Sequence, residues 1–248
     1  MRNQLTRPVD SAGLLLIRDA TGGPEVLLGR RRRTARAFPG EYVFPGGVVE
    51  PVDACASGFP EPVPMPAGGL DRTTRARLRV FARTALRECY EETGLLLETG
   101  SPPGDRAESP HGAPVWQAYA DAGTVPAFAN LLLVARAITP VAYPMRFHSR
   151  FFMAVLGAAG LSLANDATPL VGDGELEDLG WVPVAETGRL PVADANALVL
   201  GEALARLGDF QRQGGPWPAA AAPPAPCFTW RGPDERLYRT IGPPRRNA

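Results

Sequence analysis

The sequence contains no lysine, because all 26 of its basic residues are arginine. A lysine nucleophile or Schiff base is therefore impossible. The 26 acidic residues bring the formal net charge to zero, so there is no global positive field for nucleic acid. Only three cysteines are present, far apart, which argues against a disulfide framework or zinc site. The N-terminus is polar and the apolar run at 12–17 is short, so we expect a cytoplasmic protein without a signal peptide, membrane span or nucleic-acid partner.

Three glutamates share one face of a predicted helix. Glu88, Glu91 and Glu92 are three and four positions apart, which brings their carboxylates together. Like charges at this spacing destabilise a helix by about a few tenths of a kcal/mol per pair, unless water screens them or a cation neutralises them. Dense oxygen ligands of this kind suit Mg²⁺ or Mn²⁺. The alternative is a solvated acidic face without a ligand.

The same helix has an apolar stripe, which predicts that it packs on a core. Asp71 or Thr73 can cap its start, and Gly94 is placed just after its end. The carboxylates would then stand on a rigid helix and face away from the core. The stripe consists of Leu78, Phe81, Ala82, Ala85 and Cys89.

A glycine-rich segment at 44–53 completes a larger pattern with residues 87–95. Together they resemble the Nudix box, which runs glycine, five residues, glutamate, seven residues, then Arg-Glu-x-x-Glu-Glu-x-Gly and an aliphatic residue. Asp53 replaces the first glutamate, and 26 additional residues, about 54–79, separate the two halves. This insertion is rich in proline and glycine to residue 70 and in arginine after it, so we expect a loop that leaves the core, followed by an early extension of the helix. The matching positions are Gly47, Arg87, Glu88, Glu91, Glu92, Gly94 and Leu95.

This resemblance implies an α/β fold, the Nudix-type α/β/α sandwich, with a mixed β-sheet flanked by helices. The box would form a strand, a loop and a helix around a site for Mg²⁺ or Mn²⁺. Such ions neutralise a diphosphate and lower the pKa of water, which suits hydrolysis of a phosphoanhydride. Arg87 would orient the carboxylates through a salt bridge, while Gly46 would let the backbone approach a substrate closely. The implied metal ligands are Glu88, Glu91, Glu92 and the carbonyl group of Gly47.

Residues 27–47 are similar to an additional signature of coenzyme A-cleaving Nudix enzymes, except at Gly29 and Arg32. One branch of these enzymes also carries a long insertion in the box. Five arginines lie between positions 30 and 36, and they form either a solvated loop or a phosphate site, since guanidinium groups match phosphate oxygens in two-point contacts. In the second interpretation, Arg31 and Arg36 contact the substrate. The fitting positions are Leu27, Leu28, Arg31, Arg36, Gly40 and 44–47.

Apolar patterns elsewhere predict the remaining elements. We expect a single Nudix domain over 1–210, followed by a Pro- and Ala-rich linker and C-terminal extension over 211–248 with a small strand or hairpin at 228–241. The predicted strands lie at 11–18, 25–29, 42–44, 131–138, 150–156 and 179–182, and the predicted helices at 114–122 and 194–207.

The general base is left open between three acids. Glu88 is one candidate, and Glu175 and Glu177 are the others, either as base or as ligand of a further metal ion. Both of the latter also fit a solvated acidic loop. His148 is either a structural hydrogen-bonding residue or a contact to substrate.

Three functions are compatible with these residues. The favoured one is cleavage of CoA or acyl-CoA to 3′,5′-ADP and 4′-phosphopantetheine, with the arginine cluster on the 3′-phosphate. The second is hydrolysis of ADP-ribose or another nucleoside diphosphate derivative. The third is a Nudix domain that only senses a nucleotide, although the three box glutamates are present and no helix-turn-helix segment is visible. The expected partner is a small nucleotide-derived substrate, and a homodimer is left open.

Overall fold

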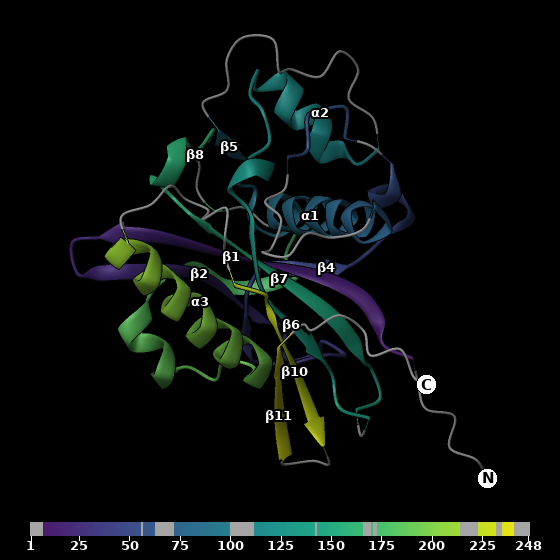
Figure 1. Ribbon diagram of the computed structural model, residues 1–248, viewed down its shortest axis with the longest axis vertical. Helices are drawn as coiled ribbons and strands as arrows, with labels where there is room; N and C mark the ends of the chain where they lie inside the picture. The colour runs from purple at the N-terminus through teal and green to yellow at the C-terminus, as the bar shows by residue number, and fades with distance from the viewer. Residues whose placement is uncertain are drawn as a thin grey trace.

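The computed structural model describes residues 7–55, 57–62, 72–99, 112–141, 143–165, 170, 173–213, 223–231 and 235–240. Its centre is a mixed sheet built around β1 (Val9–Ala20), a strand that is buried on both faces (Figure 1). β1 pairs in parallel with β7 (Phe147–Val155) and antiparallel with β2 (Gly23–Arg31). The sheet therefore combines parallel and antiparallel pairs, as the resemblance implied.

The remaining strands extend the sheet on both sides of β1. β7 pairs with β6 (Leu132–Ile138), which pairs in parallel with β10 (Pro226–Arg231), and β11 (Glu235–Thr240) forms the edge. On the other side, β2 pairs with β3 (Tyr42–Val43) and β9 (Leu176–Pro183). β4 (Gly46–Val48) pairs with the beginning of β1, and β5 (Leu97–Thr99) and β8 (Leu161–Leu163) form a small second sheet. All predicted strands, including the C-terminal hairpin, are present.

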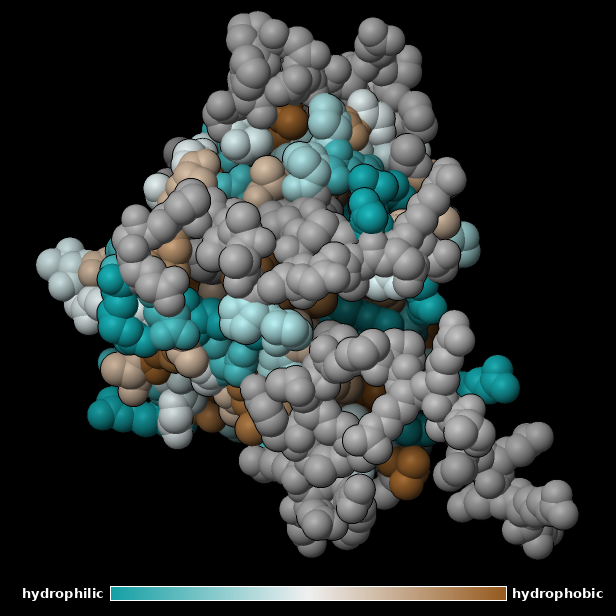
Figure 2. Space-filling view, viewed as in Figure 1, coloured by the Kyte–Doolittle hydropathy of each residue, from teal (hydrophilic) through white to brown (hydrophobic). Residues whose placement is uncertain are grey.

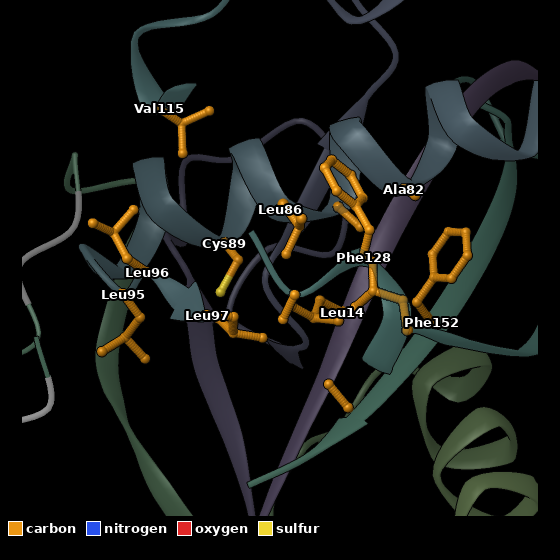
Figure 3. Packing of buried hydrophobic residues seen from close by; sticks show 14 of the residues in the cluster. Leu14, Ala82, Leu86, Cys89, Leu95, Leu96, Leu97, Val115, Phe128 and Phe152 are labelled. Carbon is orange, nitrogen blue, oxygen red and sulfur yellow. The ribbon is translucent and has the colours of Figure 1, made fainter. Parts of the chain in front are cut away.

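Helices α1 (Arg72–Thr93) and α2 (Pro114–Asp121) cover one face of the sheet (Figure 1). Every residue of the predicted apolar stripe on α1 is buried, and Figure 3 shows Leu86 and Cys89 of this helix above Leu14 of β1. Gly94 follows the helix with a φ of +74°, and its N–H donates to the carbonyl of Tyr90 over 2.7 Å. The predicted caps at the start of α1 lie outside the described part, because it includes neither Asp71 nor the side chain of Thr73.

Helix α3 (Asp194–Gln213) covers the opposite face and packs on a second apolar cluster. The sheet is thus enclosed between two helical layers, and the predicted α/β/α sandwich is confirmed. Short 3-10 turns complete the described elements: η1 (Pro51–Ala54), η2 (Phe128–Asn130), η3 (Ala158–Gly160) and η4 (Val184–Arg189).

Residues 57–62 of the box insertion are packed into the protein, which corrects the expectation of a segment leaving the core for this part of 54–70. Phe59 is 7% exposed and its ring lies edge-on to Tyr119 of α2, at 6.1 Å between centroids. Glu61 accepts two hydrogen bonds from Arg83 of α1, at 2.8 and 2.7 Å. The prediction failed because one aromatic ring and one buried ion pair outweigh a composition rich in proline and glycine. Residues 63–71 lie outside the described part.

Where Figure 2 colours the surface by hydropathy, hydrophilic side chains predominate and hydrophobic ones lie in small separate patches. Large exposed hydrophobic side chains are few among the described residues, and two of them, Tyr143 and Met145, line a cavity. In the same residues, no helix has the length and apolarity needed to cross a membrane.

Candidate active site

The first half of the box brings its glycines against both β1 and α1. A Cβ on Gly46 would lie 2.5 Å from the carbonyl oxygen of Ala12, so only glycine fits there. A Cβ on Gly47 would overlap the carboxylate of Glu88. The N–H of Gly46 donates to Glu92 over 2.8 Å. The two halves of the box, separated in sequence, therefore meet in space as the resemblance implied.

Arg87 links the two halves of the box at this junction. Its Nε and Nη2 each donate over 2.9 Å to Asp53, and its Nη2 also donates to the carbonyl of Val48 over 3.1 Å. Nη1 faces Glu88 at 2.9 Å and Glu91 at 2.7 Å. Burial opposes the charge of Arg87, but the hydrogen bonds to Asp53 and the nearby carboxylates raise its pKa. Arg87 therefore contacts carboxylates from both halves of the box, which is the geometry expected of a residue that orients them.

The three box glutamates occupy different environments. Glu88 and Glu91 line a cavity, whereas Glu92 is 2% exposed and lies behind Gly46. Burial raises the pKa of Glu88 to about 7 and that of Glu92 to about 8. Repulsion from Glu91 adds to the first shift, and repulsion from Glu88 adds to the second. Burial also raises the pKa of Glu91. Negative charge at this face is therefore poorly compensated by the protein alone.

The carboxylate face opens into a cavity of about 470 Å³. Its walls come from the start of β1, from β4, from α1 and from the arginine-rich segment after β2. A second cavity of about 460 Å³ lies over the α3 side of the sheet, and Arg36, Phe38 and Asn196 are among the residues that line both. The two cavities are therefore adjacent parts of one cleft.

The arginine-rich segment contributes two differently engaged guanidinium groups. Arg31 Nη1 lies 3.1 Å from Glu175 and 3.7 Å from Glu92, so it is already held beside the carboxylates. Arg36 is exposed, lines both cavities and has no ion pair among the described residues. Glu175 lines the first cavity, but Glu177 does not, because it pairs with Arg30 at 3.0 Å. The structure thus brings all the predicted site residues together except Glu177.

The donor set fits a hard divalent cation in its chemistry. Glu88 and Glu91 present carboxylate oxygens to the cavity, which Gly47 also lines, with the Glu88 carboxylate lying directly against this glycine. Burial raises the pKa of both groups, so their ionised forms are disfavoured unless a positive charge compensates them. In the described part of the chain, however, no three His, Cys, Asp or Glu side chains converge as a ready ligand set. Instead, Arg87 forms ion pairs with Glu88 and Glu91.

Comparison with solved structures agrees with this geometry. The structure of a NUDIX hydrolase from Alicyclobacillus acidocaldarius matches with a TM-score of 0.57 and 28% sequence identity, over 80% of this chain and 92% of that chain. The chain has the Nudix hydrolase fold. The match also confirms the prediction of an enzyme of the Nudix hydrolase type.

Other Nudix structures are less similar. The NUDIX domain of Shewanella oneidensis NrtR, complexed with ADP ribose, matches at 14% identity and a TM-score of 0.46, over 84% of this chain and 93% of that one. A C. elegans Ap4A hydrolase matches at 15% identity and a TM-score of 0.43, over 82% and 99%. No protein-family model and no curated protein matches the chain significantly.

His148 lies outside the cleft of this Nudix fold. Its Nε2 is 2.6 Å from Arg136 Nη2, and its Nδ1 is 3.7 Å from Asp10. Burial and the charges of Arg150 and Arg136 lower its pKa to about 4. It lines neither of the two large cavities, which favours the structural interpretation of this histidine.

Two cleft residues were missed in the sequence. Phe38 lines both cavities and has a φ of +52°, which is unusual for a bulky side chain. Asn196 on α3 also lines both and is 7% exposed. Phe38 stands inside the coenzyme A-like signature, between Arg36 and Gly40, but at a position that the signature leaves open. Asn196 had no signal, because a single asparagine near a helix start resembles an ordinary surface residue.

Proposed function

We propose that this chain hydrolyses the diphosphate linkage of CoA or acyl-CoA and releases 3′,5′-ADP and 4′-phosphopantetheine. The observation that carries the proposal is that the carboxylate face of α1 and the side chain of Arg36 line one cavity. The carboxylate face would hold the diphosphate of the substrate through a cation. Arg36 would hold a third phosphate on the same substrate. Both are within a space of about 470 Å³.

The box residues have different roles in binding the diphosphate. Glu88 and Glu91 are the cation ligands that face the cavity, with Glu92 and the Gly47 carbonyl beside them. A divalent cation, when bound, supplies positive charge that neutralises the diphosphate and acidifies the attacking water. Arg87 keeps the carboxylates in place through its contacts with Asp53. Arg31, held against Glu92 and Glu175, is positioned for the diphosphate rather than for a distant group.

The 3′-phosphate is assigned to Arg36. A guanidinium group without an ion pair loses no protein partner when it binds a phosphate, whereas Arg31 must give up Glu175. Among the candidate bases, Glu88 and Glu175 line the cavity and Glu177 is held by Arg30, so we assign the base to one of the first two.

Hydrolysis of ADP-ribose or another nucleoside diphosphate derivative is the second candidate. One observation favours it: the pairing of Arg31 leaves Arg36 to hold a 3′-phosphate without help from the arginine beside it in the cleft. A substrate that lacks this phosphate needs no such group. The two candidates differ in their products, which makes them separable by experiment.

The test is a product assay with Mg²⁺ or Mn²⁺ on CoA, acetyl-CoA, ADP-ribose, NADH and nucleoside triphosphates. We expect 4′-phosphopantetheine and 3′,5′-ADP from CoA, and a loss of turnover of roughly a hundredfold or more in Glu88→Gln. Glu186→Gln, an exposed position outside both cavities, is the matched control and should retain activity. Normal turnover by folded Glu88→Gln contradicts the site, and cleavage of ADP-ribose alone selects the second candidate.

A further inference from the structure

Asn196 is a buried amide without a hydrogen-bonding partner among the described residues. It is the third residue of α3, it is 7% exposed, and no hydrogen bond from a described residue reaches its side chain. Every fully enclosed side-chain nitrogen and oxygen in the described part of the chain has a hydrogen-bonding partner. The amide of Asn196 must therefore reach open space, and it lines both cavities of the cleft. An amide that opens into the cleft without a partner among the described residues is free to donate to and accept from a ligand there.

Phe38 supplies an apolar wall to the same two cavities. Its ring centroid is 6.3 Å from that of Phe147 on β7, with 35° between the planes. The left-handed backbone at Phe38, with φ +52°, costs conformational energy that an exposed loop residue would normally avoid. Strained backbone of this kind is found where a side chain must be presented to a ligand.

The second cavity has the size and chemistry for a planar heterocycle. It encloses about 460 Å³, and the box glutamates do not line it, so it is separate from the cation site. Trp230 and Val192 extend its apolar wall. Glu41 and Asp194 line it as hydrogen-bond acceptors, and burial together with the charge of Asp194 raises the pKa of Glu41. These acceptors favour a ligand that carries an amino group.

We propose that Asn196 recognises the adenine ring of the substrate, with Phe38 stacked on that ring. This inference rests on the proposed function and names the nucleotide half that the second cavity receives. Asparagine pairs with adenine through two hydrogen bonds, accepting from the 6-amino group and donating to N7. Stacking on the Phe38 ring does not distinguish one base from another. The choice of adenine over other bases therefore depends on the Asn196 amide. Arg36 lines the same cavity, which places a 3′-phosphate within reach of the adenosine that carries it.

Hypoxanthine is the matched probe, because it differs from adenine by a 6-oxo group in place of the 6-amino group. Neither orientation of the Asn196 amide can satisfy both O6 and N7 of hypoxanthine, since both are acceptors. The amide can donate to only one of them, and its own oxygen then faces the other. A preference for adenine over hypoxanthine therefore reports on this single side chain.

The experiment is titration calorimetry of the full chain with ADP and with IDP, in EDTA so that no hydrolysis occurs. We expect the parent protein to prefer ADP by roughly 10- to 100-fold, the discrimination of one two-point pair. Asn196→Leu should lose that preference while its Tm is unchanged or higher, and Asn196→Ala serves if the leucine variant fails to fold. Phe38→Leu should weaken both ligands alike, because the ring contacts either base.

Several results would overturn the inference. These are equal binding of ADP and IDP by the parent protein, binding of neither, a preference that survives in Asn196→Leu, or displacement of ADP by 4′-phosphopantetheine alone. The preference for ADP is measured without catalysis. A preference that depends on Asn196, in a protein that does not cleave CoA, supports the adenine site and contradicts the proposed substrate.

Discussion

Arg87 and Asp53, 34 positions apart in the sequence, form a two-point ion pair in the core, with both nitrogen–oxygen distances at 2.9 Å. Their side chains are 3% and 1% exposed. Asp53 also accepts from the hydroxyl of Thr84 at 3.0 Å and from the N–H of Glu50 at 2.9 Å. The acid that departs from the Nudix pattern therefore anchors the arginine that contacts the carboxylates that we propose to hold the cation.

Asp53→Asn should strongly destabilise the protein. It leaves the buried charge of Arg87 without its main partner, and such a loss costs about 3–5 kcal/mol. Urea unfolding measures the free energy of unfolding directly. Asp209→Asn is the matched control, because its pair with Arg212 is exposed and should contribute roughly 0–1 kcal/mol. Equal effects of the two substitutions would show that the pair does not anchor the box.

Phe59→Ala should destabilise the protein by about 3 kcal/mol, the usual cost of removing a buried aromatic ring. The reason is that the beginning of the insertion packs on α2 through this ring. Val141→Ala, at a side chain that is 58% exposed, is the control and should change stability by no more than about 0.5 kcal/mol. If both variants unfold at the same urea concentration as the parent, the insertion is not part of the core.

His148 should make stability fall at acid pH. Its folded pKa of about 4 lies below the ordinary value of 6.5, so the unfolded chain binds the additional proton between those values. Stability is therefore retained above pH 6.5 and lost as the pH falls towards 4, by roughly 1–2 kcal/mol at pH 4.5. The groups that face the ring are Asp10, Arg77, Arg136 and Arg150.

Thermal unfolding between pH 7 and pH 4.5 measures this dependence. His148→Gln should show a smaller loss than the parent over that interval, because glutamine does not titrate. Parallel curves for the two proteins would mean that His148 titrates normally in the folded state. Activity near neutral pH should be little affected, since His148 lies outside the cleft.

The sequence predicted the elements whose signals are local. The apolar stripe of α1 and the carboxylates beside it follow from helical spacing alone, and the structure buries the former and points Glu88 and Glu91 into a cavity. Gly46 and Gly47 were also predicted, because close approach of backbone to another group admits only glycine.

Features that depend on distant partners were not predictable in the same way. Phe59 stands in a segment rich in proline and glycine, and its burial depends on Tyr119, far along the chain. Arg31 and Arg36 look equivalent in the sequence, yet Glu175 engages only the first. Asn196 lines a cleft together with residues of β7 and of the arginine-rich segment, which are distant from it in the sequence.

The most direct test of the account compares catalytic efficiency on CoA and on dephospho-CoA, which lacks only the 3′-phosphate. We predict that the parent protein prefers CoA by roughly 10- to 100-fold, the value of one charge-assisted contact of about 1.5–3 kcal/mol. Arg36→Ala should lose this preference and keep its efficiency on dephospho-CoA. Equal efficiency of the parent protein on both substrates, or cleavage of ADP-ribose with none of either, would contradict the assignment of coenzyme A.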